Sequence, residues 1–443
     1  MTVQARICLV GTHNPSFGRI QLMAEGLRER GYDVASCVEP AWGSTAERVA
    51  SAHRGLRNPD LARRLAASYA RIATRLRALT PSPDVLLVGY PGQLDVVVLR
   101  ALFPQARIVL DAFVSLDETL EDRSIGSPHG PTRLTAQWLD RLAFRLADRI
   151  VVDTAAHGRR LAVRYGLDLT RTVVVPVGAA DPVKRDSAPH PDPGADSDPN
   201  IVILSSPGGA PPDIRNDITG DVIESAAKDP SHDADQNLVI LSAAKDPSHH
   251  ADLRVLYVGG FIPLHGVSTI VEAARRIPAT AGVRFDLVGD GQDAPMVERM
   301  LIETPLPHVR LIRTWTSEEQ LVEDHLSEAD VCLGIFARRP KAMDVVPAKV
   351  YLGMACGLPV VTADSPAIRE EILDHVASGP PPLIVCPPED PSALAECLLE
   401  LRDNPERRRQ VGAAARHIYE LRFRPARVVT PLVACIEDIV TRG

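Results

Sequence analysis

Short apolar segments alternate with longer amphipathic segments over most of the 443 residues. An apolar run of about four to eight residues is typical of a strand buried on both faces, and the segment after it is typical of a covering helix. Strands and helices that alternate in this way form parallel sheets. In the first half we expect strands at Ile7–Val10, Val85–Val88, Ile108–Leu110, Ile150–Val152 and Val173–Val175, and helices at Arg19–Arg30, Pro59–Leu79, Pro131–Leu146 and Ala155–Tyr165.

The same alternation resumes in the second half. Strands are expected at Leu253–Val258, Arg284–Val288, Val309–Ile312, Val331–Ile335, Pro359–Thr362 and Leu383–Val385. Helices are expected at Gly266–Arg276, Pro295–Glu303, Glu318–Glu328, Ala348–Cys356 and Ser365–Asp374. The sequence therefore predicts an α/β protein with two doubly wound, Rossmann-like domains.

A segment of different composition, residues 185–252, separates the two halves. It contains no Phe, Tyr, Trp or Cys, and Val222–His232 is repeated almost unchanged at Val239–His249, with a decayed third copy beginning at Val202. Each copy has too few apolar side chains to bury a core. Solenoid repeats are usually longer, about 20–50 residues. We therefore expect a mostly disordered, low-complexity insertion between the domains.

Charge and cysteine content exclude several classes of protein. The formal net charge of −8 argues against a general nucleic-acid binder. The insertion, however, carries 13 acidic and 4 basic residues, so the remainder of the chain is nearly neutral. The seven cysteines form no C-x-x-C pair, which argues against structural zinc and favours a reducing cytoplasm. No apolar run is long enough to span a membrane.

Two glycine-containing turns follow expected strands of the second half. Gly259 and Gly260 end the first of these strands, and Gly289 ends the next. Glycines allow backbone N–H groups to approach a ligand, and a following helix start favours an anion. The turn at Gly259 and Gly260 therefore predicts a diphosphate cradle, although it is not the G-x-G-x-x-G dinucleotide fingerprint. For the Gly289 turn, an ordinary tight connection between strand and helix is the alternative interpretation.

Lys349 is the candidate cation for this cradle. Pro347 marks a helix start, which places Lys349 in the first turn, where a positive charge gains nothing from the helix dipole. We therefore expect Lys349 to neutralise a bound phosphate.

In these motifs and their order, the chain resembles family 4 (group 1) glycosyltransferases of GT-B fold. Phe261–Gly266, Val346–Tyr351 and Gly357–Val361 are similar to the donor domain of that family. Asp111–Asp117, Leu139–Arg141 and Val152–Thr154 are similar to the acceptor domain of one bacterial branch. The resemblance implies two domains facing across a cleft: 1–184 on the acceptor side and 253–420 on the donor side. Residues 421–443 would cross back to the first domain as a helix.

The resemblance also implies an activity. Such enzymes transfer a hexosyl unit from a nucleotide-diphosphate sugar, without a metal or other cofactor and with retention of anomeric configuration. The acceptor would be a glycan or a lipid-linked molecule in cell-envelope or exopolysaccharide synthesis. Basic side chains and a helix N-terminus would stabilise the charge of the leaving diphosphate.

Carried onto this sequence, the resemblance implies a set of site residues. His265 stands where most relatives have Lys, Gly260 replaces the usual Arg, and Lys349 would supply the positive charge. The expected catalytic residues are Lys349, His265 and Asp111. The expected donor-binding residues are Gly259, Gly260, Gly289, Trp315, Asp344, Asp364 and Glu370, or Glu371 beside it.

The acceptor-side candidates follow strands of the first half. His13 and Arg19 lie in the loop after the first strand, where open α/β sheets place ligands. Asp111 and Asp117 flank another strand end and would contact the acceptor. Capping of the loops by these carboxylates is the alternative interpretation.

One position departs from the family pattern. The carboxylate that binds the donor ribose is replaced by Leu352, and its upstream partner is Asp344 instead of Glu. Loss of these charge-assisted hydrogen bonds would weaken donor binding by a few kcal/mol. A catalytically impaired scaffold is therefore the alternative function, and a GT-B sugar-nucleotide epimerase is a further one.

The segment 59–79 has two interpretations. Its leucines recur at helical spacing between several arginines. A basic amphipathic helix can bind an anionic membrane surface, which would place the protein on the inner face of the cell membrane. A helix that packs its apolar stripe on the sheet has the same pattern.

Overall fold

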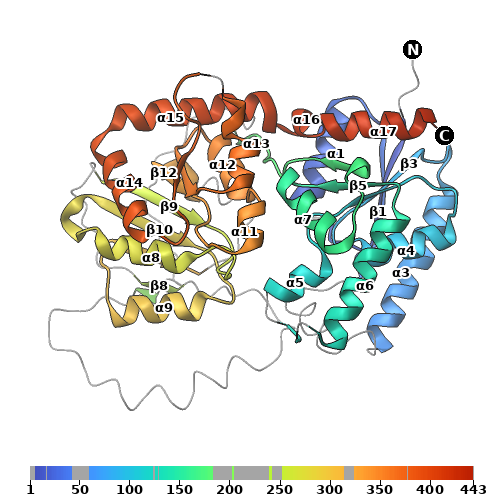
Figure 1. The fold of residues 1–443 in the computed structure, drawn as a ribbon, viewed down its shortest axis with the longest axis horizontal. Helices are drawn as coiled ribbons and strands as arrows, with labels where there is room; N and C mark the ends of the chain where they lie inside the picture. Colours follow the sequence, from blue (N-terminus) through green and yellow to red (C-terminus); the bar gives the residue numbers. More distant parts are fainter. Residues whose placement is uncertain are drawn as a thin grey trace.

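The computed structural model describes residues 5–15, 17–41, 59–122, 125–127, 129–182, 202–203, 239–241, 252–313, 324–376 and 378–442. These residues form two α/β domains that lie side by side, with the C-terminal helices running from one to the other (Figure 1). The predicted doubly wound architecture is confirmed. The predicted helix Glu318–Glu328 lies partly outside the described residues, and only a 3₁₀ turn at Leu326–Glu328 is seen there.

The first domain contains a parallel six-stranded sheet in the order β2-β1-β3-β4-β5-β6. Its strands are β1 Ile7–Gly11, β2 Val34–Val38, β3 Val85–Val88, β4 Ile108–Asp111, β5 Arg149–Val152 and β6 Thr172–Val174. Its helices are α1 Gly18–Glu29, α3 Pro59–Ala78, α4 Gln93–Leu102, α5 Leu116–Asp122, α6 Pro131–Leu146 and α7 Ala155–Tyr165. The expected strands and helices are all present, while β2, α4 and α5 were not predicted.

The second domain has the same design. Six parallel strands have the order β14-β13-β12-β9-β10-β11. They are β9 Leu253–Val258, β10 Val283–Val288, β11 Val309–Ile312, β12 Val331–Leu333, β13 Val360–Ala363 and β14 Ile384–Cys386. The helices are α8 Val267–Arg276, α9 Ala294–Glu303, α11 Pro340–Asp344, α12 Ala348–Ala355, α13 Pro366–Glu371, α14 Pro391–Asp403 and α15 Pro405–Ile418.

Two short strands of the repetitive segment extend this second sheet. β8, Val239–Leu241, pairs antiparallel with β11, and β7, Val202–Ile203, pairs parallel with β8. Each strand coincides with the apolar start of one sequence repeat, because that is where two or three β-branched or aliphatic residues stand together. The rest of 185–251 lies outside the described residues.

The C-terminal segment lies on the first domain. It forms α16, Pro425–Val428, and α17, Thr430–Arg442, which follow the second-domain helix α15 (Figure 1). The Tyr32 hydroxyl donates to Glu437 at 2.7 Å, and Arg149 pairs with Asp438 at 2.9 Å. These contacts tie the end of the chain to the sheet of the opposite domain.

The apolar core is continuous across the domain boundary. One cluster joins Leu9 and Val151 of the first sheet to Val350 and Leu352 of α12 and to Phe423. The rings of Tyr351 and Phe423 lie 4.8 Å apart, edge to face. Burial of this shared apolar surface holds the two domains in one arrangement. Within the described ranges, none of the helices combines the length and the apolar character that crossing a membrane would require.

Candidate functional site

The glycine turns of the second domain lie at the carboxyl ends of neighbouring strands. Gly259 follows β9 with φ 136°, and Gly289 follows β10 with φ 143°, a backbone conformation that other residues rarely adopt. A Cβ at Gly289 would lie 2.0 Å from the Gly259 carbonyl oxygen, so the two turns can pack only without side chains.

Lys349, in the first turn of α12, reaches this Gly259 turn. A Cβ on Gly259 would lie 2.8 Å from Lys349 Nζ. Nζ also lies 4.0 Å above the centre of the Tyr257 ring and 3.4 Å from His265 Nδ1. The residue is only 7% exposed, and burial lowers the pKa of its ammonium from 10.5 to about 7. In the part of the chain that the structure describes, no carboxylate pairs with this ammonium.

His265 occupies the other side of the same turn. Its Nδ1 lies 2.6 Å from the Gly260 carbonyl oxygen, a contact that requires the Nδ1–H tautomer, and the Tyr257 hydroxyl donates to that oxygen at 3.0 Å. Burial, with the Lys349 charge beside it, lowers the pKa of His265 well below its usual value. His265 is therefore a neutral imidazole that fixes the Gly260 carbonyl, and Lys349 is the group of this pair that can carry a positive charge near neutral pH.

Gly259, Gly260, His265 and Lys349 thus form one cluster, which we call the Lys349 cluster. A buried cation without a carboxylate partner is unfavourable in an empty protein. A phosphate bound there would pair with Lys349 and meet the exposed backbone at the Gly259 turn. The cluster has the chemistry of an anion site.

Asp344 lies at the boundary between the domains. Its carboxylate pairs with Arg160 of α7 at 3.3 Å, and its carbonyl oxygen accepts from the Thr154 hydroxyl. Burial raises the pKa of Asp344, although the charge of Arg160 opposes this effect. Asp344, one of the expected donor-binding residues, is therefore held by the first domain.

The remaining donor-side candidates are dispersed. Glu370 pairs with Arg159 of the first domain at 2.7 Å, and Asp364, in the turn before α13, accepts from Arg369 of that helix at 2.7 Å. Glu371 accepts from the Ala155 backbone N–H at 2.9 Å. These carboxylates have protein partners and do not enter the Lys349 cluster.

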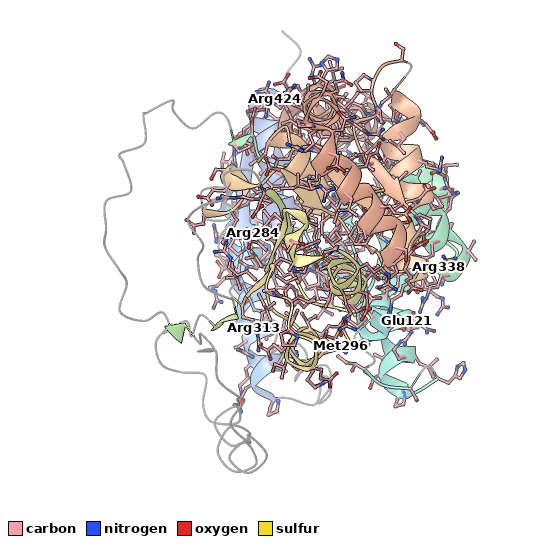
Figure 2. The ribbon with its side chains drawn as sticks, turned by 90° about the vertical axis from the view of Figure 1, so that its left-hand side faces the viewer. Glu121, Arg284, Met296, Arg313, Arg338 and Arg424 are labelled. Atoms are coloured by element: carbon pink, nitrogen blue, oxygen red, sulfur yellow. The ribbon has the colours of Figure 1, made fainter. Side chains whose placement is uncertain are left out.

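Trp315 lies outside the described residues. The last described residue before it, Arg313, pairs with Asp290 and with Glu298 of α9 at 2.9 Å. Figure 2 looks onto the second domain. It shows Arg313, and Met296 on α9, in the lower part of that domain.

Leu352 faces the interior. It is 4% exposed and belongs to the apolar cluster shared by both domains. It stands one helical turn after Lys349 and offers no polar group at the position where the resemblance implies a ribose-binding carboxylate.

The acceptor-side candidates Arg19 and Asp111 form a buried ion pair. Arg19 Nε donates to the two Asp111 oxygens at 3.0 and 3.1 Å, and Nη1 donates to the Val175 carbonyl at 2.9 Å. Both side chains are at most 1% exposed. The pair joins the start of α1 to the ends of β4 and β6.

Asp117 and His13 are also buried. Asp117 pairs with Arg133 and Arg164, and these pairs tie α5 to α6 and α7. Neither ring nitrogen of His13 has a hydrogen-bond partner among the described residues, and burial lowers the pKa of this imidazole to about 4. His13 lines a surface pocket of about 380 Å³ between α1 and β2, together with Gln21 and Arg28.

The apolar stripe of α3 packs on the sheet. Leu61, Leu65, Ile72 and Leu76 are buried, and Arg71 and Arg75 both pair with Glu39 at 2.8 Å. The packing alternative accounts for the periodicity of this helix. Membrane contact through its exposed arginines stays a prediction.

Arg160 and Lys341 are not among the residues expected from the sequence, yet both make contacts across the domain boundary. Lys341 of α11 pairs with Asp122 of α5, and Arg160 pairs with Asp344. Neither residue lies in a glycine turn, at a strand end or at an expected helix start, so no local signal in the sequence marks it.

Models of two known protein families match the chain, one for each domain. A model of the glycosyl transferase 4-like domain matches residues 19–178, and a model described as glycosyl transferases group 1 matches residues 252–404. The two matches coincide with the two domains and leave out the repetitive segment between them.

Curated relatives match over part of the chain. An uncharacterised glycosyltransferase of Methanocaldococcus jannaschii is 26% identical over 157 residues, 35% of this chain and 40% of that protein. The amylovoran biosynthesis glycosyltransferase AmsK of Erwinia amylovora is 28% identical over 174 residues, 39% of this chain and 41% of that protein. The matched stretches thus span about 40% of the length of these relatives.

Solved structures share the fold over nearly the whole chain. HepE of Anabaena, solved with UDP, aligns with a TM-score of 0.58 at 14% identity and covers 98% of this chain and 100% of that one. Sucrose-phosphate synthase of Thermosynechococcus elongatus aligns with a TM-score of 0.62 at 14% identity, with 100% of both chains covered. At this level of identity the likeness establishes the fold alone, with its two sheets and flanking helices.

Proposed function

The chain belongs to the group 1 glycosyltransferases of GT-B fold, and from that premise we propose that it transfers a hexosyl unit from a nucleotide-diphosphate sugar. The acceptor would be a glycan or a lipid-linked molecule of the cell envelope or an exopolysaccharide. Two structures of HepE were solved with UDP and with UDP-glucose, which makes these two compounds suitable first probes.

The Lys349 cluster carries this proposal. Transfer leaves a nucleoside diphosphate whose bridging oxygen gains negative charge as the glycosidic bond breaks. A preorganised cation in a desolvated site stabilises such charge more strongly than water does. Lys349 has this role, and the Gly259 and Gly289 turns give the diphosphate room to approach the backbone.

The proposed reaction needs no metal, because Lys349 and the backbone N–H groups at the start of α8 would share the diphosphate charge. The anomeric configuration would be retained, as the resemblance implies. His265 would position the turn through its bond to the Gly260 carbonyl oxygen, and Asp344 would accept hydrogen bonds from the donor sugar. We place the reaction on the cytoplasmic face of the membrane, with the exposed arginines of α3 as the peripheral contact.

Calorimetric titration with UDP, GDP and ADP and with their glucose derivatives tests this proposal. We expect one nucleoside diphosphate and its sugar to bind the unmodified protein. Lys349→Gln should weaken both by about tenfold to a hundredfold, since a charge-assisted hydrogen bond contributes about 1.5–3 kcal/mol. The control Arg276→Gln, on the exposed far end of α8, should bind as the unmodified protein does. Absence of binding to every member of the panel would contradict the proposal.

A catalytically impaired scaffold is the second candidate function. It is favoured by Leu352, which packs in the shared core and gives a ribose nothing to bind. The two candidates differ in turnover. An enzyme releases nucleoside diphosphate from the bound sugar nucleotide when membrane extract supplies acceptors, whereas a scaffold binds the same compound and releases none.

A further inference from the structure

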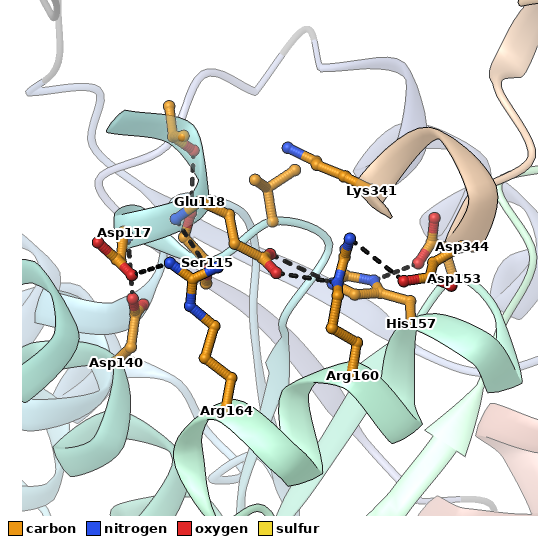
Figure 3. A network of polar contacts seen from close by, with 12 residues as sticks. Ser115, Asp117, Glu118, Asp140, Asp153, His157, Arg160, Arg164, Lys341 and Asp344 are labelled. Carbon is orange, nitrogen blue, oxygen red and sulfur yellow. Dashed lines mark hydrogen bonds and ion pairs between the residues drawn. The ribbon is translucent and has the colours of Figure 1, made fainter. Parts of the chain in front are cut away.

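A buried polar network connects the first domain to Asp344 (Figure 3). It begins at Asp153, which lies 2.5 Å from His157 Nδ1, and continues from His157 Nε2 to Glu118 at 3.6 Å. Asp153, His157 and Glu118 are at most 3% exposed. All three belong to the first domain, so the network is anchored in its core.

Arg160 is the last member of this network before the domain boundary. Its Nε lies 3.1 Å from Glu118 Oε1, and its Nη1 lies 3.3 Å from Asp344 Oδ2. Figure 3 shows the Arg160 side chain rising from α7 between these two carboxylates. The guanidinium is thus held between two carboxylates from opposite domains, and this ion-pair contact restricts where its charge can lie relative to Asp344.

Asp344 has a second contact with the first domain. The Thr154 hydroxyl, at the start of α7, donates to the Asp344 carbonyl oxygen. The first domain therefore fixes both the backbone and the side chain of Asp344. The one side chain that the proposed function assigns to the donor sugar is placed from the opposite domain.

The charges in the network alternate in sign. Burial alone would raise the pKa of Glu118, but the nearby His157 imidazole and the charge of Arg160 outweigh it and lower that pKa to about 2. Burial likewise opposes the charged form of His157, but Asp153 and Glu118 raise its pKa to about 9. At neutral pH His157 is thus a cation and Glu118 an anion, and Arg160 pairs with an anion on each side.

We propose that Arg160 is a positioning residue for the donor sugar: it holds the Asp344 carboxylate in the orientation that accepts the sugar hydroxyls. The inference rests on the proposed function, because it needs a donor sugar at Asp344. It also makes sugar recognition depend on the contact between the domains. The nucleotide part of the donor, bound at Lys349, does not depend on Arg160.

Separate binding measurements for nucleoside diphosphate and for the sugar nucleotide test this inference. The panel described above supplies the pair that binds. In the Arg160→Ala variant, we expect the affinity for the diphosphate to be unchanged. The additional affinity provided by the sugar should fall by about fivefold to fiftyfold, since a hydrogen bond to a charged group contributes about 1.5–3 kcal/mol. Arg160→Lys, which keeps the charge but not the two-point contact, should restore part of it.

Two further variants separate positioning from stability. Arg149→Ala removes another half-buried arginine of the same domain, paired with Asp438 at 2.9 Å, and should leave both affinities unchanged. In an Asp344→Asn background, Arg160→Ala should have no additional effect on sugar affinity, because the carboxylate through which it acts is gone. Thermal unfolding confirms that each variant is folded.

Each outcome decides the inference. The inference would be overturned if the additional affinity provided by the sugar were unchanged in both Arg160→Ala and Arg160→Lys. It would also be overturned if the diphosphate and the sugar nucleotide lost affinity equally. Either result would leave the proposed function intact. An additional effect of Arg160→Ala in the Asp344→Asn background would overturn the inference as well. No binding of any nucleotide to the unmodified protein would overturn the proposed function itself, and the inference with it.

Discussion

Lys349 and Arg19 are both buried cations near the carboxyl ends of parallel strands, but their surroundings differ. Arg19 has the Asp111 carboxylate at 3.0 Å and a backbone carbonyl at 2.9 Å. Lys349 has an aromatic ring, a neutral imidazole and a glycine turn. A paired buried charge contributes to a fixed structure, whereas an unpaired one costs stability and favours the binding of an anion. The comparison separates a structural cluster from a ligand site, although both were candidates in the sequence.

Breaking the paired cation should have the largest effect. Arg19→Ala leaves the Asp111 carboxylate buried without its partner, and we expect a loss of about 3–5 kcal/mol in the free energy of unfolding. Urea-induced unfolding followed by tryptophan fluorescence measures this. A loss below about 1 kcal/mol would show that the pair carries little of the domain's stability.

Removing the unpaired cation should stabilise the protein instead of destabilising it. In Lys349→Met we expect the free energy of unfolding at pH 7 to rise by about 1–3 kcal/mol, because a buried charge without a partner is replaced by an apolar side chain of similar length. The folded-state pKa of Lys349 is about 7, below its unfolded value of 10.5, so the destabilisation is full below pH 7 and disappears toward pH 10.5. Urea unfolding at pH 7 and pH 9 should show the advantage of the variant shrinking. A clear loss of stability at pH 7 would contradict this interpretation.

Binding of a diphosphate should be linked to protonation of Lys349. At pH 8 the Lys349 side chain of the unliganded protein is mostly the neutral amine. A bound phosphate favours the ammonium form, so binding should take up close to one proton. Affinity should therefore weaken by up to about tenfold per pH unit above 7. Calorimetry in two buffers of different ionisation enthalpy measures the proton uptake. An uptake near zero at pH 8 would mean that Lys349 does not contact the phosphate.

An exposed ion pair provides the smallest expected effect and the reference for the buried ones. Arg75 pairs with Glu39 at 2.8 Å on the surface of α3, with about half of its side chain exposed. Arg75→Ala should lower the free energy of unfolding by about 0.2–1 kcal/mol, since such pairs are screened by water and salt. The same unfolding measurement in 1 M salt should reduce even this difference.

Much of the fold could be predicted because its signals are local. The strands β3 and β9 coincide with their predicted bounds, since a continuous apolar run indicates a buried strand wherever it occurs. β2 was missed because Val34–Val38 contains Ser and Cys and lies at the sheet edge, where only part of it is buried. The helix α5 was missed because its seven residues include four carboxylates and show little periodicity.

The candidate site was predictable only in part. Gly259, Gly260 and Lys349 were expected from turns and a helix start, and His265 from the family resemblance; the structure brings the four together. Asp111, Asp117 and Arg19 have the same residue types as ligand-binding side chains, and only the structure shows them paired with each other or with neighbouring helices. Residue type does not reveal whether a buried charge has a partner.

The sequence alone determined the two-domain α/β architecture, the family and the glycine turns, because each depends on residues that are close together in the chain. The tertiary structure alone decided which charges are paired, where the end of the chain lies and how Arg160 reaches Asp344. These contacts join residues that are far apart in sequence. Periodicity and spacing report the preference of a local segment, whereas the electrostatic state of a side chain depends on every group that packing brings near it.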